Sequence, residues 1–77
     1  MEIEIAFGEV LKQERKNKNI TQEELAFYCD LDRTYISLLE RGKRNPTIGA
    51  VFKIARVLEL KPSSLIFKIE NKINFNL

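Results

Sequence analysis

Residues 33–41 carry the side chains with the clearest chemical potential in this chain. Successive residues of an α-helix turn by roughly 100°, so Ile36 and Leu39 fall on one side with Tyr35 at its edge. The opposite side carries basic, hydroxyl and branched groups: Arg33, Thr34, Ser37, Leu38 and Arg41. Arginine can bond a guanine edge twice, hydroxyls can donate or accept, and Thr or Leu can contact a thymine methyl. The pattern predicts a helix that packs on a core and reads DNA bases; an ordinary amphipathic surface helix is the alternative.

Residues on both sides of this helix can contact DNA phosphates. Gln22 opens the preceding helix, where its side chain and nearby backbone N–H groups can bind a phosphate. The candidates that follow or end the helix are Arg41, Lys43, Arg44 and Asn45. The net charge is only +2, yet residues 33–56 carry many bases against Glu40 alone. A local positive field favours a polyanionic partner, and a solvated basic surface is the alternative interpretation.

The composition argues against an enzyme. The chain has no His and one Cys, and Cys29 falls on a predicted core stripe. No Gly-rich phosphate loop, Ser-based motif or metal-ligand cluster is evident. Glu23 and Glu24 are adjacent, so they diverge around a helix and cannot converge on a substrate. We therefore expect no catalytic residues, no cofactor and no metal site.

The elements that position these residues read as five short helices in one all-α domain, residues 1–77. The helical core is expected over about 6–70, with 71–77 as a tail. Thr21 and Glu24 form a capping box signature at the second helix, and Asp32 and Thr47 can cap the third and fourth. Pro62 suits the first position of the fifth helix. The first helix is expected from about residue 6 to 18, and the third from about 33 to 41.

The two ends show a different periodicity. Apolar residues alternate with polar ones at Ile3, Ile5 and Phe7, and again at Ile73, Phe75 and Leu77. Period-two alternation is typical of strands, so one hypothesis pairs the two ends as a small sheet. The favoured interpretation is a frayed N-terminus and an unstructured tail.

The helix-turn-helix region resembles a known family. Gln22, Ala26, Ile36 and the run Glu40-Arg41-Gly42 are similar to the phage Cro and cI repressors, the Xre family, and the match extends from about Phe7 to Phe67. The resemblance implies a compact five-helix lambda-repressor-like fold. The run 31–37, LDRTYIS, also resembles the controller proteins of restriction–modification systems.

The resemblance implies roles for individual residues. The family's base-reading positions are occupied by Arg33, Thr34 and Leu38, with Tyr35 and Ser37 as auxiliary contacts. Its phosphate-contacting positions are occupied by Gln22, Lys43, Arg44 and Asn45. Arg15 and Glu40 match a pair that bridges the first helix and the end of the third, and Arg15 also counts among the phosphate candidates. Departures from the family are Asp30 and Glu59, where Gly is usual, and Leu38, where a polar reader is common.

These observations predict a DNA-binding transcriptional regulator that acts as a homodimer on a roughly palindromic operator. Control of restriction–modification genes, including its own, follows from the narrower resemblance. The expected dimer contact lies on the fifth helix and consists of Leu65, Ile66, Phe67 and Ile69. The alternative is that these residues all belong to the core.

RNA polymerase is a further candidate partner, and the acidic residues Glu23 and Glu24 of this chain would form the contact. An antitoxin-like or other protein-interaction module is the alternative function. The lone Cys29 and the absence of a long apolar run predict a cytoplasmic protein with no membrane association.

Overall fold

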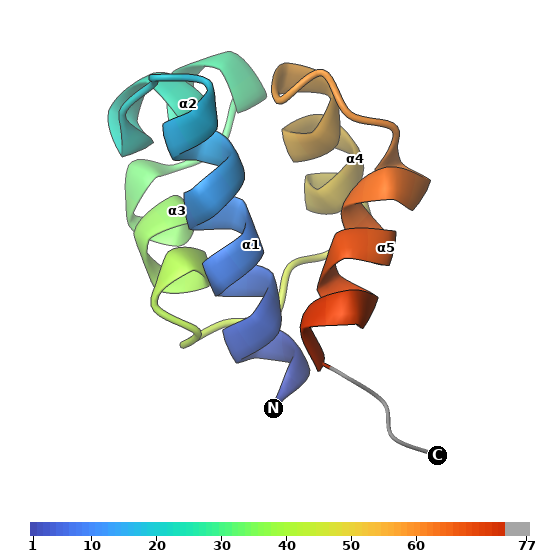
Figure 1. Cartoon of the computed structure of the whole chain (residues 1–77). Coiled ribbons are helices and arrows are strands. Elements are labelled where there is room, and N and C mark those ends of the chain that lie inside the picture. Colours follow the sequence, from blue (N-terminus) through green and yellow to red (C-terminus); the bar gives the residue numbers. More distant parts are fainter. Residues whose placement is uncertain (74–77) are drawn as a thin grey trace.

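The computed structural model describes residues 1–73, which form five α-helices (Figure 1). The helices are α1 (Ile3–Asn17), α2 (Gln22–Cys29), α3 (Arg33–Glu40), α4 (Ile48–Val57) and α5 (Pro62–Ile73). Helix α1 packs against α3 and α5, while α4 packs against α2 and α5. The all-α prediction is confirmed over this range. None of these helices combines the length and the apolar character needed to cross a bilayer.

Local capping signals explain where three helices begin. Thr21 Oγ1 accepts from the Glu24 N–H at 3.0 Å, and Glu24 Oε1 accepts from the Thr21 N–H at 2.9 Å. Asp32 Oδ1 accepts from the Thr34 N–H at 2.9 Å, and Thr47 Oγ1 accepts from the Ala50 N–H at 3.0 Å. Each cap satisfies a backbone donor that the helix itself leaves unpaired, which stabilises it by about 1 kcal/mol. The predicted starts of α2, α3 and α4 are therefore confirmed.

Four of the helices end in the same way, with a left-handed residue followed by a backbone bond to the residue five positions earlier. The left-handed residues are Asn19, Asp30, Gly42 and Glu59, with φ between 56° and 71°. The bonds run from the N–H groups of the next residues to the carbonyls of Arg15, Ala26, Leu38 and Ala55. Asp30 therefore keeps the turn between α2 and α3, as expected for a residue that tolerates positive φ.

The structure corrects the expectation for the N-terminus. Helix α1 begins at Ile3, three residues before the predicted start, so Ile3, Ile5 and Phe7 are helical and neither a strand nor frayed. Ala6, Phe7, Val10 and Leu11 face the core at helical spacing, and this packing outweighs the period-two alternation. Helix α5 continues to Ile73. Phe75 and Leu77 lie outside the described residues.

The core collects one apolar stripe from each helix. Its largest fully buried side chains are Phe7, Leu11, Leu25, Ile36, Leu39, Ile54, Leu58 and Leu65. Cys29 is also buried, and burial raises the pKa of its thiol to about 11 because a thiolate would be poorly solvated there. The thiol is therefore protonated and unreactive at neutral pH, as expected for a core residue.

Candidate nucleic-acid interface

Helix α3 buries one side and leaves its first turn accessible. Ile36 and Leu39 have no exposed surface, whereas Arg33 and Thr34 are exposed and Ser37 and Leu38 are half-buried. A hollow of about 260 Å³ lies at this edge, lined by Gln22, Arg33, Thr34 and Ser37. The structure thus brings a predicted phosphate contact from α2 beside three predicted base readers of α3. This arrangement places donors and acceptors where a DNA groove can reach them.

Tyr35 is held by the loop that follows α3. Its hydroxyl accepts from the Thr47 N–H at 3.2 Å, and the Arg44 guanidinium lies 5.7 Å from the centre of its ring. Tyr35 therefore connects the middle of α3 to the start of α4, and its ring makes a cation–π contact with Arg44. A base contact by Tyr35 stays a prediction.

The basic loop after α3 packs on the first turn of α1. Gly42 adopts φ of 71°, and a Cβ there would come within 3.2 Å of the Ile5 backbone. Asn45 Nδ2 donates to Glu4 Oε2 at 3.5 Å, so its amide faces a carboxylate as well as solvent. Arg41, Lys43, Arg44 and Asn45 are all exposed. Their side chains form a polar rim at the C-terminal end of α3, suited to the phosphate contacts predicted for them.

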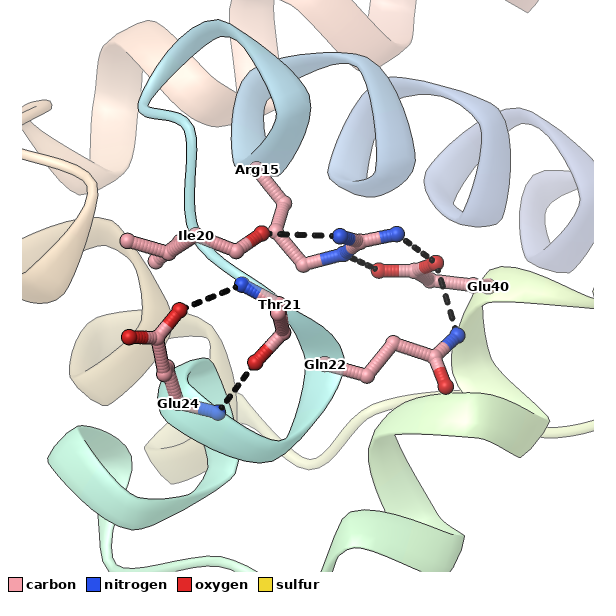
Figure 2. A network of polar contacts seen from close by, with 6 residues as sticks. All are labelled: Arg15, Ile20, Thr21, Gln22, Glu24 and Glu40. Atoms are coloured by element: carbon pink, nitrogen blue, oxygen red, sulfur yellow. Dashed lines mark hydrogen bonds and ion pairs between the residues drawn. The ribbon is translucent and has the colours of Figure 1, made fainter.

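A buried ion pair joins α1 to the end of α3 (Figure 2). Glu40 accepts from Arg15 Nε at 2.6 Å and from Arg15 Nη2 at 3.0 Å, while Arg15 Nη1 donates to the Ile20 carbonyl at 2.8 Å. The hydrogen bond to Glu40 raises the pKa of Arg15, so the guanidinium keeps its charge although the residue is buried. With only 11% of its side chain exposed, Arg15 has little surface left for a phosphate.

The same carboxylate binds the side chain that opens α2. Gln22 Nε2 donates to Glu40 Oε1 at 3.0 Å, a contact between residues far apart in the sequence. Figure 2 shows Arg15 and Gln22 meeting Glu40 from two different helices. Sequence reasoning did not anticipate this bond, because nothing local to Gln22 indicates that α3 ends beside it.

Gly8 lets α1 pack closely against the end of α3, a role that the sequence analysis missed. A Cβ on Gly8 would lie 2.4 Å from the Leu39 carbonyl oxygen and 2.7 Å from that of Glu40. Helix α1 can therefore approach the end of α3 this closely only with glycine at position 8. A glycine inside an otherwise regular helical pattern was the available signal, since glycine costs helix stability and usually has a packing reason.

The structure narrows the predicted dimer contact on α5. Leu65 and Ile69 are 0% and 6% exposed because they complete the core of their own chain, so neither can offer surface to a partner. Ile66 and Phe67 remain exposed. On α4, Ile48 is 73% exposed, and Phe52, one turn later, is also exposed. These two residues were missed as candidates for a contact between chains.

A helix-turn-helix family model, HTH_3, matches residues 11–65, which include the capped α2, the turn and α3. The chain belongs to the Xre-type helix-turn-helix family. Relatives of this helix-turn-helix protein include the control protein C.BamHI of Bacillus amyloliquefaciens, 46% identical over 65 residues that cover 83% of this chain and 80% of that protein. The control protein C.MunI of a Mycoplasma species is 43% identical over 72 residues, covering 92% and 97% of the two chains.

Solved structures give the same assignment for this Xre-type chain. The restriction-modification controller protein C.AhdI from Aeromonas hydrophila matches with a TM-score of 0.78 and 39% identity, covering 80% of this chain and 94% of that one. The controller protein C.Esp1396I, solved as a tetramer with its natural 35 base-pair operator, matches with a TM-score of 0.84 and 36% identity over 95% and 96% of the chains. The present chain is a helix-turn-helix transcriptional regulator of the restriction–modification controller type.

Proposed function

We propose that this regulator binds a roughly palindromic operator as a homodimer, with α3 in the major groove. The observation that carries the proposal is the exposed first turn of α3, where Arg33 and Thr34 stand beside Gln22 in one hollow. Arg33 and Thr34 read base edges, with Ser37 and Leu38 beside them, and the loop of residues 41–45 contacts flanking phosphates. The regulated genes are those of a restriction–modification system, including the regulator's own.

Selection of bound sequences from a random DNA pool tests the operator proposal. A dimer whose two α3 helices enter successive major grooves selects half-sites about 10 base pairs apart, related by two-fold symmetry. Such a consensus supports the proposal. Absence of any enriched sequence would contradict it and favour the protein-interaction alternative.

The dimer is proposed to form through exposed apolar residues of α4 and α5. Ile48 and Phe52 lie one turn apart on α4, and Ile66 of α5 shares a hollow of about 680 Å³ with Val51 of α4. Burying exposed aliphatic and aromatic surface stabilises association by about 25 cal/mol per Å² before the costs of binding. Two-fold pairing is also the commonest symmetry of oligomers.

A pair of matched substitutions tests where the chains meet. Phe52→Glu places a charge in the proposed contact and should shift sedimentation toward the monomer. Phe27→Glu makes the same change on α2, where Phe27 is 78% exposed, and should leave the dimer intact. The proposed surface is wrong if Phe27→Glu dissociates the chains and Phe52→Glu does not.

The exposed side of α2 supports a second, compatible function, contact with RNA polymerase. Phe27 and Tyr28 are both exposed and meet edge to face at 5.5 Å, beside the exposed Glu23 and Glu24. Aromatic residues at a surface are enriched in protein interfaces. Glu24→Gln with Phe27→Ala should lower activated transcription in a reporter assay while leaving operator affinity unchanged. Unchanged transcription would contradict this second function.

A further inference from the structure

Glu40 is the least exposed charged side chain of the interface, and it serves two helices at once. Only 2% of its side chain is exposed. Its Oε2 accepts from Arg15 Nε, and its Oε1 accepts from both Arg15 Nη2 and Gln22 Nε2. Figure 2 shows the carboxylate between the guanidinium from α1 and the amide from α2. One buried carboxylate at the end of α3 therefore fixes side chains from both neighbouring helices.

The chemistry of a carboxylate decides how the Gln22 amide is turned. An ionised carboxylate only accepts hydrogen bonds, so the NH₂ group of Gln22 must face Glu40. One of its two N–H groups donates to Glu40, and the second is left to donate to a phosphate oxygen, which the amide carbonyl oxygen cannot do. Gln22 is the first residue of α2 and also lines the hollow with Arg33, Thr34 and Ser37. The amide is thus held in one orientation at the edge where DNA would lie.

We propose that Glu40 is a positioning residue for DNA binding: its buried carboxylate, itself paired with Arg15, holds the Gln22 amide in the arrangement that the DNA backbone meets. The inference rests on the proposed operator-binding function and adds a residue that itself need not touch DNA. Preorganised side chains lose less conformational entropy on binding. A buried ion pair contributes little net stability, because desolvation offsets its attraction. The network is therefore better explained by the orientation it imposes.

The negative charge of Glu40 lets an experiment distinguish a positioning role from simple electrostatic repulsion of DNA. Removing a carboxylate beside a polyanion should by itself strengthen binding, because one repulsive charge is lost. Loss of a positioning residue acts in the opposite direction. Glu40→Gln is therefore expected to weaken binding to a labelled random-sequence duplex about tenfold, with little change in the salt slope because the Gln22 amide carries no charge. Glu59→Gln, the same charge change in the exposed pair with Lys18, should leave affinity unchanged or slightly raise it.

Two further variants keep the test decisive if Glu40→Gln fails to fold. Glu40→Asp retains the buried negative charge but withdraws the carboxylate from both Gln22 and Arg15, and it should weaken binding in the same direction. In a Gln22→Met background there is no amide to position, so the loss caused by Glu40→Asp should shrink. Full additivity of the two substitutions would overturn the claim that Glu40 acts through Gln22.

The decisive readout is affinity measured well below the melting temperature of each variant. A merely structural Glu40 would lower the melting temperature while the folded protein bound random DNA as tightly as before, or more tightly. That result would overturn the proposal. Because random-sequence DNA is the probe, this outcome is separate from failure of the operator proposal, which would appear as a wild-type chain that selects no sequence.

Discussion

The two ends of α3 are built in opposite ways. At the C-terminal end, Gly8 of α1 touches the last carbonyls, Glu40 is buried in an ion pair, and Gly42 packs on the first turn of α1. At the N-terminal end, Asp32 caps the helix, and Arg33 and Thr34 point their side chains into an open edge. Rigid support at one end and accessible side chains at the other are what a precise binding site requires.

This difference separates the buried residues that hold α3 in place from the exposed residues that contact a partner. Substitutions at the supported end should change the free energy of unfolding, because they strain or uncover buried groups. Substitutions at the open end should leave stability unchanged and alter DNA binding alone. The four predictions below probe this division.

The largest effect is expected for Gly8→Ala. The new Cβ would lie 2.4 Å from the Leu39 carbonyl oxygen, so α1 and α3 must move apart. We expect a loss of about 3 kcal/mol in the free energy of unfolding, which lowers the melting temperature by roughly 12–24 °C. Thermal unfolding followed by circular dichroism measures the change.

Gly49→Ala is the matched control for this prediction. A Cβ at position 49 would meet nothing closer than Thr47 Oγ1 at 3.9 Å. The substitution should be neutral or stabilise α4 by about 0.5 kcal/mol, since alanine favours a helix over glycine. Equal destabilisation by both substitutions would show that the close approach at Gly8 is not the cause.

Arg33→Ala probes the open end. Loss of a bidentate base contact should cost about 1–3 kcal/mol in operator affinity, with the melting temperature unchanged because Arg33 is exposed. Arg33→Lys is the sharper variant, since it keeps the charge but loses the planar fork. It should bind random DNA like the wild type while losing much of the operator preference. A large loss of stability in either variant would contradict the division between the two ends.

Lys43→Ala tests the loop beside the supported end. Its ammonium is exposed and is expected to neutralise one phosphate, so affinity should fall for all sequences and the salt slope should decrease by about one. Lys12→Ala is the control, because Lys12 lies in the groove between α1 and α5. Titrations at several salt concentrations with operator and random duplexes measure both slopes. Equal slopes for the two variants would remove Lys43 from the interface.

The smallest effect concerns Asp30 in the turn that leads into the open end. Asp30 has φ of 56°, and its carboxylate lies at the C-terminus of α2, where the helix dipole disfavours negative charge. Asp30→Gly should therefore raise the free energy of unfolding by about 0.5–1 kcal/mol. Denaturant unfolding measures it. A destabilised Asp30→Gly would mean that the aspartate makes a contact outweighing its backbone strain.

The parts of this structure that the sequence predicts well are those with local causes. Thr21, Asp32 and Thr47 cap helices within three residues, so their signals are complete in a short window. The start of α1 lacks such a signal, because Glu2 precedes it without a side-chain cap. The alternation at Ile3 and Ile5 therefore suggested a strand as one hypothesis, and a frayed N-terminus was the favoured interpretation.

What the sequence could not provide depends on which elements meet. Helical periodicity places Leu65, Ile66 and Ile69 on a broad apolar side, but only packing decides that Ile66 alone stays exposed. The exposure of Ile48 is likewise decided by how the helices pack, not by a local pattern. The bond from Gln22 to Glu40 joins residues eighteen positions apart, and no pattern within α2 or α3 encodes it. The family resemblance supplied the Arg15–Glu40 pair but not the amide that shares its carboxylate.

The most direct test of base reading by the open end of α3 is parallel selection from a random DNA pool with the wild type and Arg33→Ala. The wild type should yield a two-fold symmetric consensus, and the variant should lose preference at one base pair in each half-site while keeping the rest. A consensus that Arg33→Ala leaves unchanged at every position would contradict the assignment of base reading to this end of the helix.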